Sequence, residues 1–174
     1  VERKRPVPLK VHYLVTERRK YRRLHRLPVL VENQANPQGR RFDSEGQRGG
    51  RHGQRSDYAT PRRDEVLEEL QKQELLPSIH FIFSRAGCDE ARDRVLQSGI
   101  SLNTAEETAA VEALLQERLA QVDADDLLAL EVDQWAAGLC RGMASHHAGL
   151  VPLFKEITEE LFIAGLLKMV YATE

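Results

Sequence analysis

IHFIFSRAG, at residues 79–87, is the stretch that decides the fold, because a nearly continuous apolar run passes directly into small and polar residues. Such a run predicts a short strand over residues 79–83, buried on both faces as in a parallel sheet. Residues 143–145 and 166–171 form two more short apolar runs and are also predicted to be strands. Because helical patterns separate these strands, the sequence predicts an α/β fold with flanking helices.

The helical patterns repeat apolar residues at i, i+3, i+4 and i+7, as amphipathic helices require. They predict helices over residues 64–75, from the turn at 84–87 to about 98, over about 104–122 and 124–141, and from 152 to 165. Trp135 lies in the apolar stripe of the 124–141 helix, so we expect it in the core and not as a platform for a base. The acidic faces of the two longest helices are expected to be solvated.

The net charge of -2 hides two segments of opposite sign. Residues 1–63 hold 17 Lys+Arg against 6 Asp+Glu, a net of +11, whereas residues 64–174 hold 8 against 21, a net of -13. This asymmetry is typical of an arm that meets a polyanion, attached to a body that need not.

The basic segment contains one apolar part and one without apolar periodicity. Residues 7–15 are rich in apolar and β-branched residues and predict a strand or an extended connector. Residues 33–58 are polar and rich in Gly and Arg, which predicts a mobile loop. This loop resembles Arg-Gly-Gly segments that hold nucleic-acid backbones loosely, and a solvated linker without a ligand is the open alternative.

Composition excludes several classes of protein. Cys88 and Cys140 form no C-x-x-C pair, so neither a disulfide framework nor a zinc site is expected and a cytoplasmic location is the default. No apolar run is long enough to span a membrane, and no signal segment opens the chain, so no membrane partner is expected.

Small or polar residues follow each predicted strand at once. They are Ser84 and Arg85, then Ser145 with two histidines, then Thr173 and Glu174. In open parallel sheets, ligands collect beyond the carboxyl ends of the strands, so these clusters are expected to converge on one edge.

Three segments together resemble the superkiller (Ski-like) DExH-box helicases of superfamily two, and especially the HelY-like actinobacterial branch. They are residues 76–88, residues 142–152 with their His-His-Ala-Gly signature, and residues 155–174. Residues 5–9 also resemble the connector that leaves the first RecA-like domain of these helicases. The resemblance covers residues 1–16 and 60–174.

The resemblance implies an order of domains. Residues 1–16 would be the connector from the first RecA-like domain, residues 17–59 a basic, Arg/Gly-rich disordered linker, and residues 60–174 the helicase C-terminal (second RecA-like) domain, truncated at its C-terminus. The first RecA-like domain of the same chain and single-stranded RNA, with DNA as the alternative, would be its partners.

The resemblance also implies ATP and Mg²⁺ as cofactors of the intact protein, neither bound tightly by this chain. The sequence contains no G-x-x-x-x-G-K-[ST] phosphate loop. Asp89-Glu90-Ala91-Arg92 looks like a DEAD box, but it opens a helix, where acids suit the helix dipole. We therefore expect no catalytic residue and no ATP turnover in this chain alone.

The candidate site residues are read through the same resemblance. Ser84 and Arg85 would hold phosphate oxygens, and the alternative is a turn serine beside a surface arginine. His146 and His147 are not expected to bind a metal, because adjacent residues in an extended chain point to opposite sides. One of them would be a satisfied structural histidine and the other would reach the nucleic acid.

The remaining candidates lie at the last two strand ends. Gly149 would offer its backbone N–H to a phosphate. Lys155 would help, with a solvated lysine as the alternative. Thr173 would bind the nucleic-acid backbone, and Glu174 would begin the part that couples to the nucleotide.

Two further functions stay open beside a helicase. One is a non-enzymatic nucleic-acid-binding module that uses the basic arm, and the other is an α/β scaffold without activity. Salt-dependent binding separates these two.

Overall fold

The computed structural model describes residues 9–18, 22–39, 42 and 58–173. It divides into two compact units, Val1–Leu67 and Glu68–Glu174, which are taken one at a time below. The Arg-Gly-rich residues 48–51, the connector residues 5–8 and Glu174 lie outside the described residues, so the predictions made for them stay predictions.

The first unit is built around a three-stranded antiparallel sheet of order β2-β1-β5. Its strands are β1 (His12–Glu17), β2 (Leu24–Pro28) and β5 (Tyr58–Ala59), beside a small hairpin of β3 (Leu30–Val31) and β4 (Gln34–Ala35). Part of the stretch predicted as a disordered linker, residues 17–59, is therefore ordered. Low hydrophobicity did not prevent this, because β2 satisfies its backbone groups by pairing along β1.

A carboxylate at the start of helix α2 (Arg63–Lys72) ties this sheet to the helix. Glu65 Oε1 lies 2.7 Å from Arg22 Nε, and its Oε2 accepts from the hydroxyl of Thr16 at 3.2 Å and from the backbone N–H of Arg62 at 2.9 Å. The hydrogen bond from Arg22, with those from Arg62 and Thr16, lowers the pKa of Glu65 to about 2.

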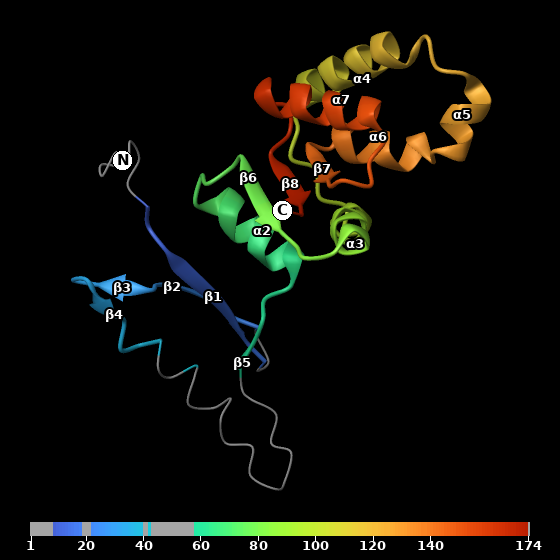
Figure 1. Cartoon of the computed structure of the whole chain (residues 1–174). Coiled ribbons are helices and arrows are strands. Elements are labelled where there is room, and N and C mark those ends of the chain that lie inside the picture. The colour runs from blue at the N-terminus through green and yellow to red at the C-terminus, as the bar shows by residue number, and fades with distance from the viewer. Residues whose placement is uncertain (1–8, 19–21, 40–41, 43–57, 174) are drawn as a thin grey trace, which may run out of the picture. The chain divides into compact units, whose positions relative to one another are not determined.

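The second unit contains a parallel three-stranded sheet of order β6-β8-β7. The strands are β6 (Ser78–Phe81), β7 (Met143–His146) and β8 (Met169–Ala172). The helices are α3 (Arg85–Gln97), α4 (Ala105–Leu119), α5 (Ala124–Ala129), α6 (Val132–Cys140) and α7 (Pro152–Ile163). Figure 1 shows this sheet flanked by helices, so the predicted α/β, RecA-like fold class is confirmed. Among the described residues, no helix is long and apolar enough to cross a membrane.

The main core lies between the sheet and α4, α6 and α7. Trp135 and Phe154 stack at its centre, with ring centroids 4.0 Å apart and planes 9° from parallel. Ile157, Leu161 and Val170 pack in the same cluster. The prediction that Trp135 belongs to the core is confirmed.

Two predictions about these elements are wrong. Strand β6 is not buried on both faces, since the side chains of Ile79 and Phe81 are 48% and 63% exposed. The helix predicted over residues 124–141 is broken into α5 and α6 at Glu131, which has a φ of 50°. The apolar spacing of that predicted helix also places Leu128 in its buried stripe, but Leu128 is 78% exposed.

Candidate nucleic-acid interface

The polar residues that follow the three parallel strands meet at one edge of the sheet, as the sequence predicts. In the register, Phe81 of β6 and His146 of β7 both lie beside Ala172 of β8. Pairing continues past the strands, because the Ile82 N–H donates to the Ala172 carbonyl at 2.8 Å and the Thr173 N–H donates to the His146 carbonyl at 3.2 Å. Backbone hydrogen bonds therefore hold the carboxyl ends of the strands side by side. This edge is where ligands of parallel sheets collect.

At the end of β6, the predicted turn is the start of α3. Ser84 is the N-cap residue, with a φ of -145°, and its Oγ accepts from the Gly87 N–H at 3.1 Å. This bond satisfies one of the N–H groups that a helix start leaves without a partner. Arg85 is the first helical residue, and both residues are exposed, but the Ser84 Oγ already caps the helix.

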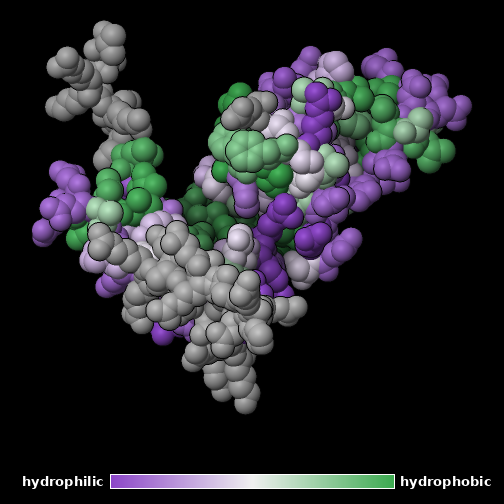
Figure 2. Space-filling view, turned by 60° about the horizontal axis from the view of Figure 1, so that its bottom comes forward, coloured by the Kyte–Doolittle hydropathy of each residue, from purple (hydrophilic) through white to green (hydrophobic). Residues whose placement is uncertain are grey.

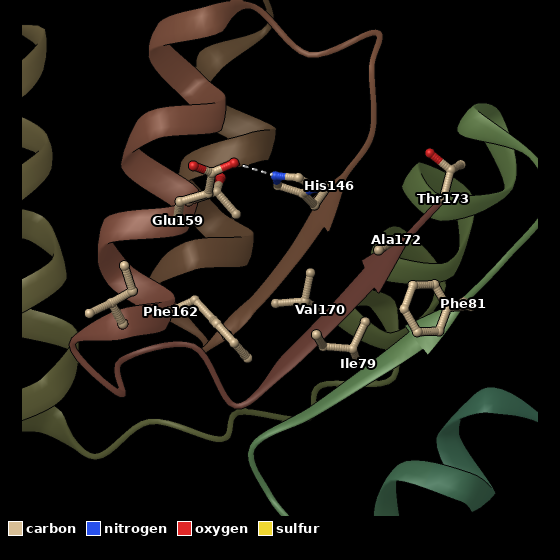
Figure 3. Close-up of a pocket in the computed structure, with 10 residues that line it drawn as sticks. Ile79, Phe81, His146, Glu159, Phe162, Val170, Ala172 and Thr173 are labelled. Carbon is tan, nitrogen blue, oxygen red and sulfur yellow. Dashed lines mark hydrogen bonds and ion pairs between the residues drawn. The ribbon is translucent and has the colours of Figure 1, made fainter. Parts of the chain in front are cut away.

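Adjacent histidines at the end of β7 point to opposite faces of the sheet. The His146 Nε2 lies 2.9 Å from Glu159 Oε1 on α7, whereas the His147 Nε2 lies 3.0 Å from Asp89 Oδ2 on α3. Figure 3 shows the first of these pairs. The described residues contain no group of three or more His, Cys, Asp or Glu side chains arranged to hold a metal ion.

His147 is the structural histidine of the two. Its side chain is 7% exposed, and its Nδ1 accepts the backbone N–H of Gly149 at 3.1 Å. The Gly149 N–H that the sequence analysis offers to a phosphate is thus directed at His147. A Cβ on Gly149 would lie 3.1 Å from His147 Nδ1 and 3.4 Å from Arg85 Cδ, so the turn packs closely against both residues.

The sequence does not predict a partly buried polar network that lies behind this edge. Asp89 Oδ1 accepts from the Ser145 hydroxyl at 2.6 Å, and Arg92 Nη1 donates to the Ser145 Oγ at 3.0 Å. Arg92 is buried and also pairs with Asp93 at 2.8 Å. The signal in the sequence was the position of Arg92 on the helix face that also carries Cys88, Ala91 and Val95.

The remaining candidates lie on α7 and after β8. Lys155 is exposed in the first turns of α7, which begins with Pro152 at its N-terminus. Thr173 is half-buried and lies beside the His146 carbonyl.

A mainly apolar groove of about 370 Å³ runs between α7 and the part of the sheet that α7 leaves uncovered. Figure 3 shows Ile79, Phe81, Val170 and Phe162 along it, with His146, Glu159 and Thr173 nearer the carboxyl end of the sheet. Elsewhere on this unit, the end that holds α5 is covered mainly by hydrophilic residues around a smaller apolar patch (Figure 2), as expected for solvated acidic helix faces.

Comparison with known proteins decides the family. The chain is 45% identical over 117 residues to the Probable helicase HelY of Mycobacterium tuberculosis, which is 67% of this chain and 13% of that protein. It is 41% identical over 114 residues to the DExH-box ATP-dependent RNA helicase DExH15, chloroplastic, of Arabidopsis thaliana, and 33% identical over 110 residues to the antiviral helicase SKI2 of Saccharomyces cerevisiae. These matches cover 66% and 63% of this chain, and 9% and 8% of the two relatives.

The chain belongs to the Ski-like DExH-box helicases, on their HelY-like branch. It spans between 8% and 13% of the length of the three curated relatives named above. No family model matches it.

Proposed function

We propose that this chain is part of an ATP-dependent RNA helicase and that it holds the backbone of single-stranded RNA at the carboxyl edge of its parallel sheet. The observation that carries the proposal is the meeting of Arg85, the Gly149 turn and Thr173 at the locked strand ends of a chain related to helicases. Residues 60–174 then form the front of the second RecA-like domain, residues 1–16 the connector and residues 17–59 a basic linker. A cytoplasmic location fits this function.

The contacts to RNA would come from groups with different strengths. Arg85 is exposed and offers a charged fork to phosphate oxygens, and Lys155 offers a point charge. Ser84 and Thr173 would add hydroxyl contacts, and His146 lies beside the edge with its ring held by Glu159. His147 and Gly149 would act by shaping the turn, because His147 is buried and the Gly149 N–H is already donated.

ATP and Mg²⁺ would serve the intact helicase. The described residues do not fit Mg²⁺-ATP by themselves, since they contain no cluster of three or more possible metal ligands and the sequence contains no phosphate loop. We therefore assign no step of ATP hydrolysis to them. Glu174 would join the nucleotide site only with the first RecA-like domain in place.

The first test measures ATP hydrolysis by this chain and by a chain extended in both directions, each with and without single-stranded RNA. We expect hydrolysis only in the extended chain and a higher rate with RNA. An extended chain that is folded, binds RNA and does not hydrolyse ATP would favour the alternative, a non-enzymatic nucleic-acid-binding module that uses the basic arm. An extended chain that neither hydrolyses ATP nor binds RNA would refute both.

The second test locates the RNA contact with a matched pair of substitutions on one helix. Arg85→Ala should weaken binding of labelled oligouridine by about tenfold or more, because a hydrogen bond to a charged group contributes about 1.5–3 kcal/mol. It should also reduce the salt dependence of binding by about 0.7 in log–log slope, the share of one phosphate contact on a single strand. Arg94→Ala, at the other end of α3, should change neither.

A further inference from the structure

One carboxylate behind the candidate interface has two partners on strand β7 and the residue after it. Asp89, on α3, accepts from the Ser145 hydroxyl with Oδ1 at 2.6 Å and faces the His147 Nε2 with Oδ2 at 3.0 Å. Arg92 Nη1 lies 3.4 Å from the same Oδ1, and Arg92 is itself buried. The carboxylate is thus held at a fixed place under the end of β7.

The two partners of His147 impose a single arrangement of its protons. A neutral imidazole has one N–H donor and one acceptor nitrogen. The backbone N–H of Gly149 can only donate, so the Nδ1 that lies 3.1 Å away must be the acceptor. An ionised carboxylate can only accept, so the Nε2 that faces Asp89 must carry the proton.

We propose that Asp89 is a positioning residue, which fixes His147 in the tautomer protonated at Nε2 and so closes the turn from His147 to Leu150. The turn is closed twice, by the Gly149 N–H to His147 Nδ1 and by the Leu150 N–H to the His147 carbonyl at 3.1 Å. If the proton moved to Nδ1, two donors would face each other at Gly149 and the first of these bonds would be lost.

The position of the turn matters for Arg85. The stem of Arg85 passes so close to Gly149 that a Cβ there would lie 3.4 Å from its Cδ. A turn that opened toward α3 would displace this stem and the guanidinium beyond it. Asp89 therefore acts on the guanidinium of Arg85 through His147 and Gly149.

The charged groups around His147 identify Asp89 as the one that contacts its ring. From α3 these are Asp89, Arg92 behind it and Arg85 over the turn, and Arg92 is shared with Asp93 at 2.8 Å. His146, the neighbour in sequence, faces the opposite side and pairs with Glu159. The carboxylate in direct contact with the His147 ring is that of Asp89, so it is the group to remove.

Nuclear magnetic resonance on the ¹⁵N-labelled chain tests the proposal directly. In the unaltered chain we expect ¹⁵N shifts of His147 that show the proton on Nε2, and a scalar coupling across the hydrogen bond between the Gly149 nitrogen and His147 Nδ1. In Asp89→Ala we expect a mixture of tautomers and loss of the coupling. Asp89→Asn is a second variant of the same shape, whose amide oxygen can still accept from the Nε2–H, and it should keep the tautomer and the coupling.

Asp93→Ala is the matched control, because Asp93 pairs with Arg92 on the same helix without contacting His147. It should leave both the tautomer and the coupling unchanged, and Trp135 fluorescence confirms folding of each variant. A His147 protonated at Nδ1 in the unaltered chain would overturn the proposal. So would a tautomer and coupling that persist in a folded Asp89→Ala, or that are lost in a folded Asp89→Asn.

The consequence for RNA rests on the proposed function and is measured separately. Asp89→Ala should weaken binding of a labelled oligouridine of about 12 nucleotides by about fivefold, and Asp93→Ala should leave it unchanged. If the unaltered chain binds no RNA while its tautomer is as expected, the proposed function fails and the role of Asp89 in the turn stands. If RNA binds and the tautomer does not depend on Asp89, the role of Asp89 fails alone.

Discussion

Substitution of two glycines by alanine should separate RNA binding from stability. Gly149 sits in a crowded place, where a Cβ would lie 3.1 Å from His147 Nδ1, 3.3 Å from its Cε1 and 3.4 Å from Arg85 Cδ. Gly99, which ends α3, is the reverse case, with a φ of +80° and nothing within 4 Å of the added atom. Alanine at position 149 would therefore crowd its neighbours, whereas alanine at position 99 would only strain the backbone.

The two costs can be worked out from these contacts. In Gly149→Ala the His147 ring is buried and held at Asp89, so the turn must move and its bond to Nδ1 at 3.1 Å lengthens. That loss and the displaced Arg85 should weaken RNA binding by about 1–2 kcal/mol, roughly fivefold to thirtyfold. In Gly99→Ala a non-glycine residue in the left-handed region should cost about 1–2 kcal/mol of folding stability and leave the affinity unchanged.

Two assays on the same samples decide between these outcomes. Fluorescence anisotropy of labelled oligouridine gives the affinity, and urea unfolding followed by the fluorescence of Trp135 gives the free energy of unfolding. If Gly149→Ala binds like the unaltered chain, the turn does not position an RNA contact. If Gly99→Ala weakens binding as much as Gly149→Ala does, the loss comes from stability and not from the turn.

Three further substitutions test the packing and the charges. Phe154→Ala should lower the free energy of unfolding by about 3–5 kcal/mol, because it removes the ring stacked 4.0 Å from Trp135; urea unfolding measures this. Leu128→Ala, at a side chain 78% exposed, should change the same quantity by less than about 0.5 kcal/mol. Glu65→Gln should speed amide exchange in β1 at neutral pH, because it lowers the free energy of opening of this sheet by about 1–2 kcal/mol. This value is smaller than the pKa shift of Glu65 alone implies, because water screens the charge of Arg22. Since the folded pKa of Glu65 is lowered from 4.5 to about 2, the contribution is complete above pH 4.5, and the difference from Gln should disappear as pH falls to about 2.

The parts of the fold that could be predicted from the sequence are those in which a local pattern of side chains is compatible with only one structure. Helices α4 and α7 begin within a residue of the predicted positions, because Thr104 caps one and Pro152 opens the other. The alternation of short apolar runs with helical patterns gave the parallel sheet. These signals are local, and no knowledge of a distant partner is needed to interpret them.

The two errors in the fold arise where local pattern does not determine the outcome. Residues 79–83 carry the same apolar run whether a helix covers both faces of the strand or only one, so the exposure of Ile79 and Phe81 is not encoded there. The 124–141 pattern fits one long helix, but Glu131 adopts a φ of 50° and lets α5 and α6 diverge. The Leu128 side chain then leaves the stripe to which its spacing assigns it.

The location of the candidate site could be predicted from the sequence, but the hydrogen bonds between its residues could not. Strand ends and the alternation of side chains in extended chain placed the polar residues on one edge and the two histidines on opposite faces. The contact between Asp89 and His147 joins residues 58 apart in the sequence, so the sequence predicts Asp89 only as an acid that opens a helix. That prediction is wrong, because α3 begins at Arg85 and has no acid in its first turn. The available sign of a buried polar contact was Arg92, a charged residue on the helix face that also carries Cys88, Ala91 and Val95.

The different partners of the two histidines change which groups would hold RNA under the proposed function. With both imidazoles paired to carboxylates, the exposed positive charges that remain among the candidates are Arg85 and Lys155. Each would contribute about 0.7 to the slope of log affinity against log salt. The double substitution to alanine should therefore lower the slope by about 1.4, and any slope left over measures the basic arm. If the slope is unchanged in the double variant, the charged contacts to RNA come entirely from the basic arm. The edge of the sheet would then have no part in holding phosphate.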